Sequence, residues 1–162
     1  MSLGRSNRDF DFLVSVFAKE ELRKYKLTII SDIYKPSVNV PENVTILSNV
    51  IGDATHPYIN NCDMMIMPIA DGRICSGDTV LLMGMQFKKT ILLTKPSTLA
   101  EMYIEDGKNG FTEEKDIDAF AKKITYLMEN PDVRKEIGEA ARESYLEKFT
   151  RYRLGQQIGR MS

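Results

Sequence analysis

The chain of 162 residues is poor in the residues and patterns that mark several protein classes. Its two cysteines are too few for a disulfide scaffold, so a reduced compartment is expected. Lys and Arg total 22 against 23 Asp and Glu, a net charge of −1, which offers no basic excess to a nucleic acid or a membrane surface. No apolar run approaches the roughly 18 residues that span a bilayer. An anion site, if present, must therefore be built locally.

Residues for metal or nucleophilic chemistry are equally scarce. The single histidine, His56, stands before Pro57 and is expected at the surface or in a turn. With Cys62 and Cys75 it makes an incomplete zinc set; Cys62 is expected in the core and Cys75 exposed in a loop. No Ser-His-Asp set, Walker loop or G-x-G-x-x-G pattern is present. We therefore predict neither a metal nor a cofactor.

The segments that are present alternate between strand and helix patterns. Continuous apolar strands such as 64–69 indicate burial on both faces, as in parallel sheets. The order predicts one α/β domain over 4–162, a Rossmann-like three-layer sandwich with a mostly parallel sheet, and Met1–Leu3 are treated as a leader outside it. Expected helices are 9–23, 53–61, 78–87, 97–104, 116–128, 132–149 and 151–161; expected strands are 26–30, 44–47, 64–69, 90–93 and a short one from Phe111.

Two segments follow predicted strands, where such sheets bind ligands. Segment 4–8 holds two arginines ahead of a helix, and guanidiniums together with free helix N–H groups suit a phosphate. Taken alone, it is explained better by a solvated terminus. Segment 76–80 contains Gly77, which allows close approach of a ligand, with Ser76 or Asp78 expected to cap the next helix. An ordinary capped helix is the alternative, and the Asp78 carboxylate would compete with an anion.

The order of the segments is more specific than any one of them. Gly4-Arg5 and Arg8 to Leu13 come first, then a strand ending Met67-Pro68-Ile69, and then the segments 75–85, 89–94 and 103–111. In this order, over nearly the whole chain, they resemble the C-terminal, donor-binding half of GT-B-fold group 1 glycosyltransferases, which are retaining enzymes of polysaccharide and glycoconjugate synthesis. The chain is accordingly expected to be a fragment without the N-terminal acceptor domain.

This resemblance implies a function and a set of site residues. A nucleotide-diphospho-sugar, a substrate rather than a cofactor, would bind here, with Arg5 and Arg8 as catalytic residues on the diphosphate and the base near 31–34 and 50–53. The full protein would transfer the sugar to a glycan or lipid-linked acceptor in the cytoplasm; peripheral contact with the inner membrane face stays open, and the fragment alone is expected to be inactive. The donor-binding residues would be Gly4, Cys75, Ser76, Gly77, Asp78, Thr79, Val80 and Met83.

The departures from the family pattern keep alternatives open. The family's paired glutamates fall at Cys75 and Met83, and a methionine is a poor acceptor for ribose hydroxyls. A non-catalytic, degenerate domain kept for protein interaction is therefore the alternative. An unrelated phosphate-binding or response-regulator-like domain ranks last, because it predicts an acidic pocket at the first strand end, where Arg5 and Arg8 stand instead.

Overall fold

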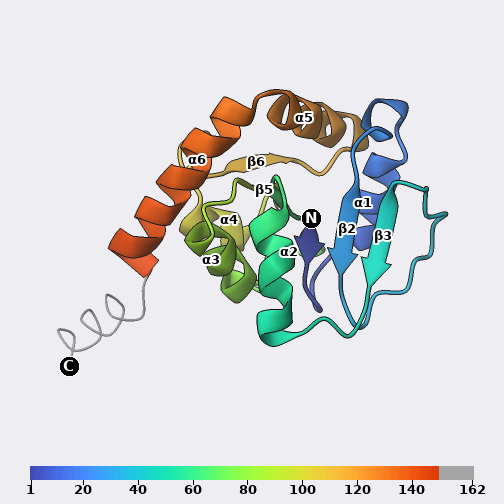
Figure 1. Ribbon diagram of the computed structural model, residues 1–162, viewed down its shortest axis with the longest axis horizontal. Coiled ribbons are helices and arrows are strands. Elements are labelled where there is room, and N and C mark those ends of the chain that lie inside the picture. Colours follow the sequence, from blue (N-terminus) through green and yellow to red (C-terminus); the bar gives the residue numbers. More distant parts are fainter. Residues whose placement is uncertain (150–162) are drawn as a thin grey trace.

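The computed structural model describes residues 1–149 as two three-stranded parallel sheets joined side by side (Figure 1). The first sheet has the order β1-β2-β3 and the second β4-β5-β6. The Ile66 N–H donates to the Met1 carbonyl at 2.8 Å, so β1 lies beside β4 and the strands run β3-β2-β1-β4-β5-β6. This order reverses between β1 and β4, as in Rossmann folds. The strands are β1 (Ser2–Leu3), β2 (Leu27–Ile30), β3 (Val44–Leu47), β4 (Met65–Met67), β5 (Ile91–Lys95) and β6 (Phe111–Glu114).

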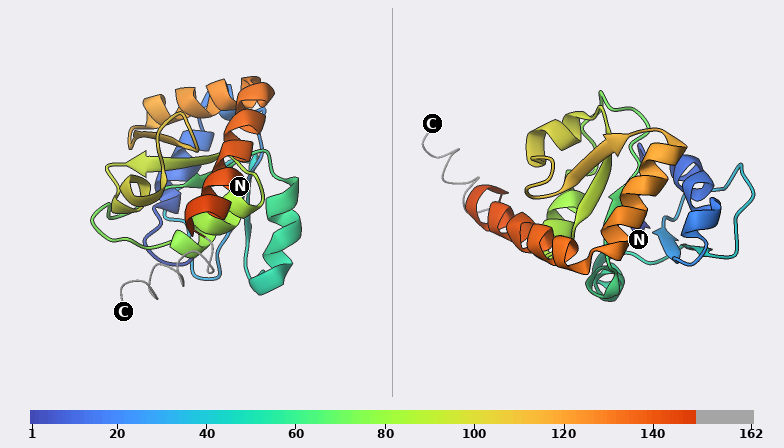
Figure 2. Two further views of the ribbon diagram at one scale, coloured as in Figure 1. Left: turned by 90° about the vertical axis from the view of Figure 1, so that its left-hand side faces the viewer. Right: turned by 90° about the horizontal axis from the view of Figure 1, so that it is seen from above.

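Helices cover both faces of the strands, which confirms the predicted three-layer fold (Figure 2). In β5, Leu92 joins the core beneath α1 and α5, whereas Ile91 and Leu93 join the core beneath α2, α3, α4 and α6. This double burial explains the continuous apolar runs in the sequence. The helices are α1 (Phe10–Phe17), α2 (His56–Asn61), α3 (Asp78–Gln86), α4 (Thr98–Tyr103), α5 (Ile117–Glu129) and α6 (Pro131–Ser144).

The first three residues belong to the fold, so the expectation that Met1–Leu3 stay outside it is wrong. Ser2 and Leu3 form β1 and pair with Ile29 and Ile30 of β2. The Ser2 hydroxyl also donates to the Ile66 carbonyl at 2.6 Å. Two residues suffice for a strand here because both of its edges are occupied, by β2 on one side and β4 on the other.

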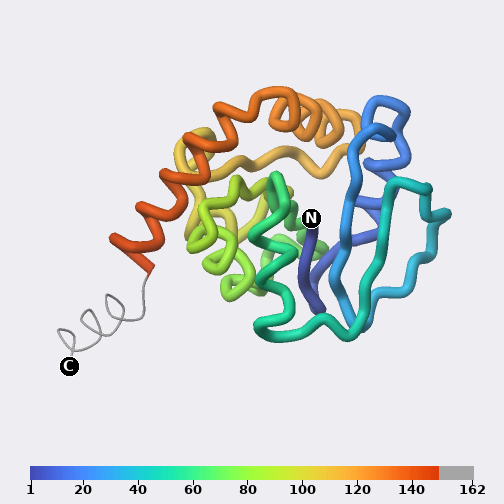
Figure 3. Tube along the Cα trace, in the orientation of Figure 1, coloured from blue at the N-terminus to red at the C-terminus, as the bar shows by residue number. Residues whose placement is uncertain are grey.

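Helix α1 ends at Phe17, well short of the predicted residue 23. The Asn43 side-chain amide donates to the carbonyls of Phe17, Leu22 and Tyr25 at 3.0–3.1 Å. A side chain from just before β3 thus satisfies the carbonyls where the helix stops and the chain turns back through a short 3₁₀ segment, Glu20–Leu22 (Figure 3). The helical periodicity of the sequence cannot indicate a hydrogen-bond partner so far along the chain.

Most other boundaries agree with prediction within a few residues. The last described helix is an exception, since α6 ends at Ser144 and continues as a π turn over Tyr145–Phe149. Strand β4 is also shorter than predicted, covering Met65–Met67. The expected helix over 151–161 lies outside the described residues.

The long loop after β2 is anchored to α1 by a tyrosine. The Tyr34 ring packs against Phe10, with centroids 5.1 Å apart, and its hydroxyl donates to Asp11 Oδ1 at 2.7 Å. The Ser37 N–H donates to the same oxygen at 3.1 Å. Burial, reinforced by the Asp11 carboxylate, raises the pKa of Tyr34 above its ordinary value.

We predict that this tyrosine makes folding stability sensitive to alkaline pH. Its folded pKa is raised, so its contribution is fully present below the unfolded pKa of about 10 and is lost as the pH rises above it. Tyr34→Phe should lower the unfolding free energy at pH 7 by about 1 kcal/mol, because one hydrogen bond is lost. In urea unfolding above pH 10, the unfolding free energy of the variant should also fall less steeply with pH than that of the parent protein. Equal slopes for both proteins would contradict the role given to Asp11.

Candidate functional site

The loops after β1 and β4 meet at the point where the strand order reverses. Arg8 forms an isolated antiparallel bridge with Ile69. The Asp9 N–H donates to the Pro68 carbonyl at 2.8 Å, and the Ala70 N–H donates to the Asn7 carbonyl at 3.1 Å. In open α/β sheets this is where ligands bind. The two segments singled out in the sequence therefore lie on adjacent loops.

Arg8 is a partly buried cation whose hydrogen-bond partners among the described residues are both carbonyls. Its Nη1 donates to the Ser6 carbonyl at 3.2 Å and, more weakly, to the Ser76 carbonyl at 3.5 Å. Its Nε is buried and has no hydrogen-bond partner within residues 1–149. Burial lowers the pKa of Arg8, yet a guanidinium stays charged at any physiological pH. A partly buried guanidinium with no carboxylate partner among the described residues is suited to an anionic ligand.

Two glycines make room for this guanidinium. A Cβ on Gly77 would lie 2.2 Å from Arg8 Nη2, and one on Gly4 would lie 2.8 Å from Arg8 Nε. Gly77 also has a φ of +104°, which L side chains rarely adopt, and is the N-cap residue of α3. Because Gly77 has no side chain, the amino end of α3 begins directly beside the Arg8 guanidinium. Cation and helix end thus converge, while their role in binding stays a prediction.

The residues next to Gly77 differ from the expected pattern. The prediction that Ser76 or Asp78 caps α3 is wrong, since Gly77 itself is the N-cap residue. Asp78 Oδ1 accepts a hydrogen bond from the Thr79 N–H at 3.0 Å. As the sequence indicated, this carboxylate competes with an anion for the N–H groups of the helix end. The Ser76 hydroxyl lies 3.5 Å from that of Ser6, on the loop after β1.

Arg5, the other predicted catalytic residue, is engaged elsewhere. Its Nε pairs with Asp32 Oδ1 at 2.8 Å, on the loop after β2, and its side chain is 71% exposed. An exposed ion pair of this kind is weak, so it does little to hold Arg5 in place. Arg8, not Arg5, is therefore the cation built into the site.

Two predicted donor-binding residues carry sulfur. Cys75 is exposed, as expected, and its thiol donates to Met102 Sδ at 3.5 Å. Met83, like Val80, is partly buried against the core beneath α2, α3, α4 and α6. Burial, together with the negative groups of nearby Asp78 and Cys75, raises the pKa of the Tyr103 phenol. Met102 and Tyr103 come from α4, which sequence reasoning had not connected with the site.

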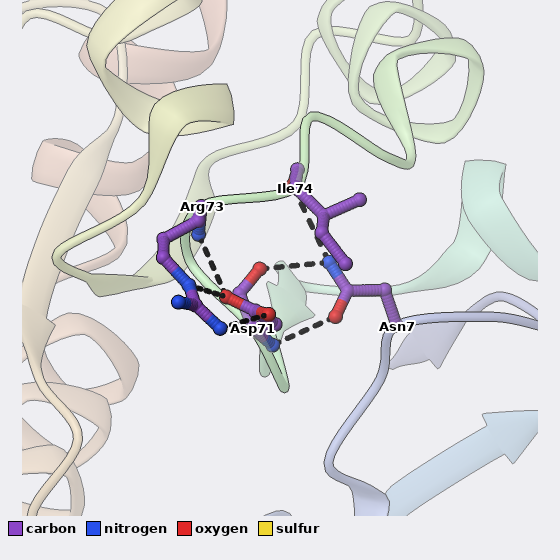
Figure 4. Close-up of polar contacts among 4 residues, drawn as sticks. All are labelled: Asn7, Asp71, Arg73 and Ile74. Carbon is purple, nitrogen blue, oxygen red and sulfur yellow. Dashed lines mark hydrogen bonds and ion pairs between the residues drawn. The ribbon is translucent and has the colours of Figure 1, made fainter.

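Asn7 joins the two loops through its side chain (Figure 4). Its Nδ2 donates to the carbonyls of Asp71 and Ile74 at 3.0 and 3.3 Å. Its Oδ1 accepts from the Asp71 N–H at 2.7 Å. The Asp71 carboxylate in turn holds Arg73, which donates from Nε and Nη2 at 3.1 Å each. Sequence reasoning gave Asn7 no role, because all three of its partners are backbone atoms.

Asp9 and Asp11 form one of two Asp-x-Asp pairs in the sequence; the other is Asp116 and Asp118. Asp9 caps α1 by accepting from the Phe12 N–H and pairs with Lys115 at 2.7 Å. Asp11 accepts from Tyr34 and Ser37, as described above. Both carboxylates thus have structural partners. Within residues 1–149 no three His, Cys, Asp or Glu side chains gather as a metal site would require.

The single histidine and the other cysteine, Cys62, lie away from these loops. His56 begins α2, with 42% of its side chain exposed, so the surface prediction is confirmed. Cys62 follows α2 and is only partly buried. Burial raises the pKa of its thiol, which donates to the Ile59 carbonyl.

Two hollows lie at opposite ends of the strands. One of about 350 Å³ lies at the amino ends of β1, β2 and β4 and includes Phe17, Cys62 and Met64 among its lining residues. The other, about 410 Å³, lies between the loops after β4 and β5, with Arg73 and Lys95 in its wall. Only the second is on the side of Arg8, so the first has no part in the candidate site.

Comparison with known proteins places the chain in a family. The family model described as "Glycosyl transferases group 1" matches residues 1–130. The chain belongs to this group 1 glycosyltransferase family. No curated protein matches it significantly. Among the described residues, this family member has no helix long and apolar enough to cross a membrane.

Solved structures show that the fold is shared with glycosyltransferases. A glycosyltransferase from Rickettsia africae has 21% identity and a TM-score of 0.79, over 99% of this chain and 46% of its own. Anabaena HepE in complex with UDP-glucose has 14% identity and a TM-score of 0.78, over 99% and 48%. The C-terminal domain of LpcC, a group 1 family protein from Francisella tularensis, has 16% identity and a TM-score of 0.73, over 93% and 84%. This chain therefore spans about half of the first two proteins and corresponds to a C-terminal GT-B half.

We predict that inorganic pyrophosphate stabilises this domain through Arg8. At one hundred times its dissociation constant, a ligand of the folded state adds about 2.7 kcal/mol to the unfolding free energy. Arg8→Gln should abolish this gain in thermal unfolding. Arg142→Gln, at a partly exposed arginine that donates to the Gln86 carbonyl at the carboxyl end of α3, should keep it. A pyrophosphate shift that survives in Arg8→Gln would rule out Arg8 as the anion ligand.

Proposed function

We propose that this chain is the donor-binding half of a glycosyltransferase that uses a nucleotide-diphospho-sugar. In the full protein, the sugar passes to a glycan or lipid-linked acceptor held by another domain, in polysaccharide biosynthesis. The observation that carries the proposal is the partly buried Arg8 guanidinium, which lies against Gly77 at the amino end of α3 with carbonyls as its only partners in residues 1–149.

The proposed ligand matches the charge of the site. The amino end of a helix carries roughly half a positive elementary charge, and its first N–H groups have no partner within the helix. In α3 the Thr79 N–H donates to Asp78, so a ligand would have to displace this carboxylate to use that N–H group. The helix end and the Arg8 guanidinium together favour a group with two adjacent negative centres, which is the nature of a diphosphate. The chain as a whole is nearly neutral, so this local arrangement rather than the global field would select the ligand.

The same groups would act on the reaction. Glycosyl transfer passes through an oxocarbenium-like centre as the bond to the diphosphate breaks, and negative charge grows on the leaving oxygens. A cation that is already desolvated stabilises that growing charge more strongly than a solvated one. Arg8 would therefore bind the departing nucleoside diphosphate more tightly than the intact donor. Arg5 would assist only after leaving Asp32.

The nucleoside would extend toward the loops after β2 and β3. Ile33 and Ile51, on these loops, are 53% and 70% exposed and offer apolar surface to a base. Tyr34 is a poor stacking partner, since its ring already packs against Phe10. HepE of Anabaena was solved in complex with UDP-glucose and with UDP, which supports uridine nucleotides as first ligands to test.

A pair of glycine variants tests the proposal. Gly77→Ala and Gly107→Ala both place a Cβ on a residue with positive φ, +104° and +78°, so both should lose about 1 kcal/mol of stability. Only Gly77→Ala meets a neighbour, the Arg8 guanidinium, whereas nothing lies within 4 Å of a Cβ on Gly107. In calorimetric titration with UDP, Gly77→Ala should weaken binding at least about tenfold and Gly107→Ala should leave it unchanged.

The outcomes separate the two functions that the sequence left open. Binding of UDP by the parent chain together with its loss in Gly77→Ala supports a working donor site. If no nucleoside diphosphate binds at millimolar concentration, the donor-binding proposal fails and the non-catalytic, interaction-only domain becomes the better account. Equal UDP affinity in both variants would show that the nucleotide does not bind next to Arg8.

A further inference from the structure

The loop over residues 70–77 is held from two sides. On one side, the Thr98 N–H donates to the Gly72 carbonyl at 2.7 Å, and a Cβ on Gly72 would lie 2.0 Å from the Pro96 carbonyl oxygen. On the other side, the Asn7 side chain makes the three backbone hydrogen bonds shown in Figure 4. The Ile74 end of the loop, which leads into Ser76 and Gly77, is reached by Asn7 alone among these contacts.

The chemistry of the asparagine fits this task closely. A primary amide both donates twice and accepts, so one side chain can bind two carbonyls and one N–H together. Asn7 also has a φ of +55°, and asparagine tolerates this left-handed region better than other non-glycine residues. Residue 7 stands directly before Arg8, so the amide that anchors the loop belongs to the same turn as this cation.

We propose that Asn7 is a positioning residue for the donor site. By tying the carbonyls of Asp71 and Ile74 to the loop after β1, it sets the separation between Arg8 and the Ser76–Gly77 turn. This separation determines whether a diphosphate contacts the guanidinium and the amino end of α3 at once. The inference rests on the proposed function, since it assumes that a nucleoside diphosphate binds there.

The decisive variant is Asn7→Gly, with Asn43→Gly as its matched control. Glycine accepts the backbone conformation at position 7 and removes all three hydrogen bonds without adding charge. Asn43 also donates its amide to three backbone carbonyls, yet it lies at the carboxyl end of α1, away from these loops. Both variants should lower the unfolding temperature. Titration with UDP at a temperature where both are folded should show at least a roughly tenfold weaker affinity for Asn7→Gly alone.

Asn7→Asp supplies a second measurement should Asn7→Gly fail to fold. Its carboxylate still accepts from the Asp71 N–H but faces the carbonyls of Asp71 and Ile74 without a donor. Amide hydrogen exchange should therefore remain slow at Asp71 and become faster over 74–77, with weaker UDP binding. Added salt should not restore the affinity, as it would if the new charge merely repelled the nucleotide.

The outcomes are distinguishable from failure of the proposed function. If the parent chain does not bind UDP or another nucleoside diphosphate, the proposed function has failed before Asn7 is tested. If the parent binds and both Asn7 variants bind equally well, Asn7 is not a positioning residue. If Asn43→Gly weakens UDP binding as much as Asn7→Gly, the effect reflects general loss of stability and the positioning role is rejected.

Discussion

The candidate site depends on one partly buried cation, Arg8, that has no carboxylate partner in the described chain. Taking a guanidinium out of water costs free energy, and the carbonyls of Ser6 and Ser76 recover only part of it. The fold accepts this because Gly4 and Gly77 leave no side chains in the space that Arg8 occupies. An ion pair would satisfy the charge but would also fill the place of a ligand. The arrangement is therefore organised for an incoming anion rather than for maximal stability.

The architecture could be predicted from the sequence because it follows from short-range patterns. Apolar runs such as 64–69, alternating with amphipathic helices, are sufficient to indicate a parallel sheet covered on both faces. Helix α1 shows the limit of this approach. Its apolar stripe continues past Phe17, yet the helix stops where Asn43 satisfies the free carbonyls. Strand β1 shows another limit, because two residues carry no periodicity and are recognised only through their neighbours β2 and β4.

The site was predictable to the extent that it rests on residue type. Arginine and glycine in the segments 4–8 and 76–80 pointed to a phosphate site, and the structure brings Arg8 and Gly77 into contact. Side-chain direction was beyond the sequence: Arg5 turns to Asp32, and Met102 reaches Cys75 from α4. The Asn7 contacts could not be predicted for a different reason. All three partners are backbone atoms, which every residue type has, so the sequence does not indicate them. The family match at residues 1–130 agrees with the fold without deciding these details.

Strand β1 has a consequence for how the domain assembles. It pairs with Ile29 and Ile30 on one side and, through Met1, with Ile66 on the other, so its contacts bridge distant parts of the chain. Contacts of such long sequence separation form slowly, because the intervening chain must close a large loop first. Until β1 inserts, the turn that carries Arg8 has no fixed place next to α3. The capacity to bind an anion should therefore be among the last properties that this chain acquires as it folds. Binding of a ligand would then indicate that β1 has inserted between β2 and β4.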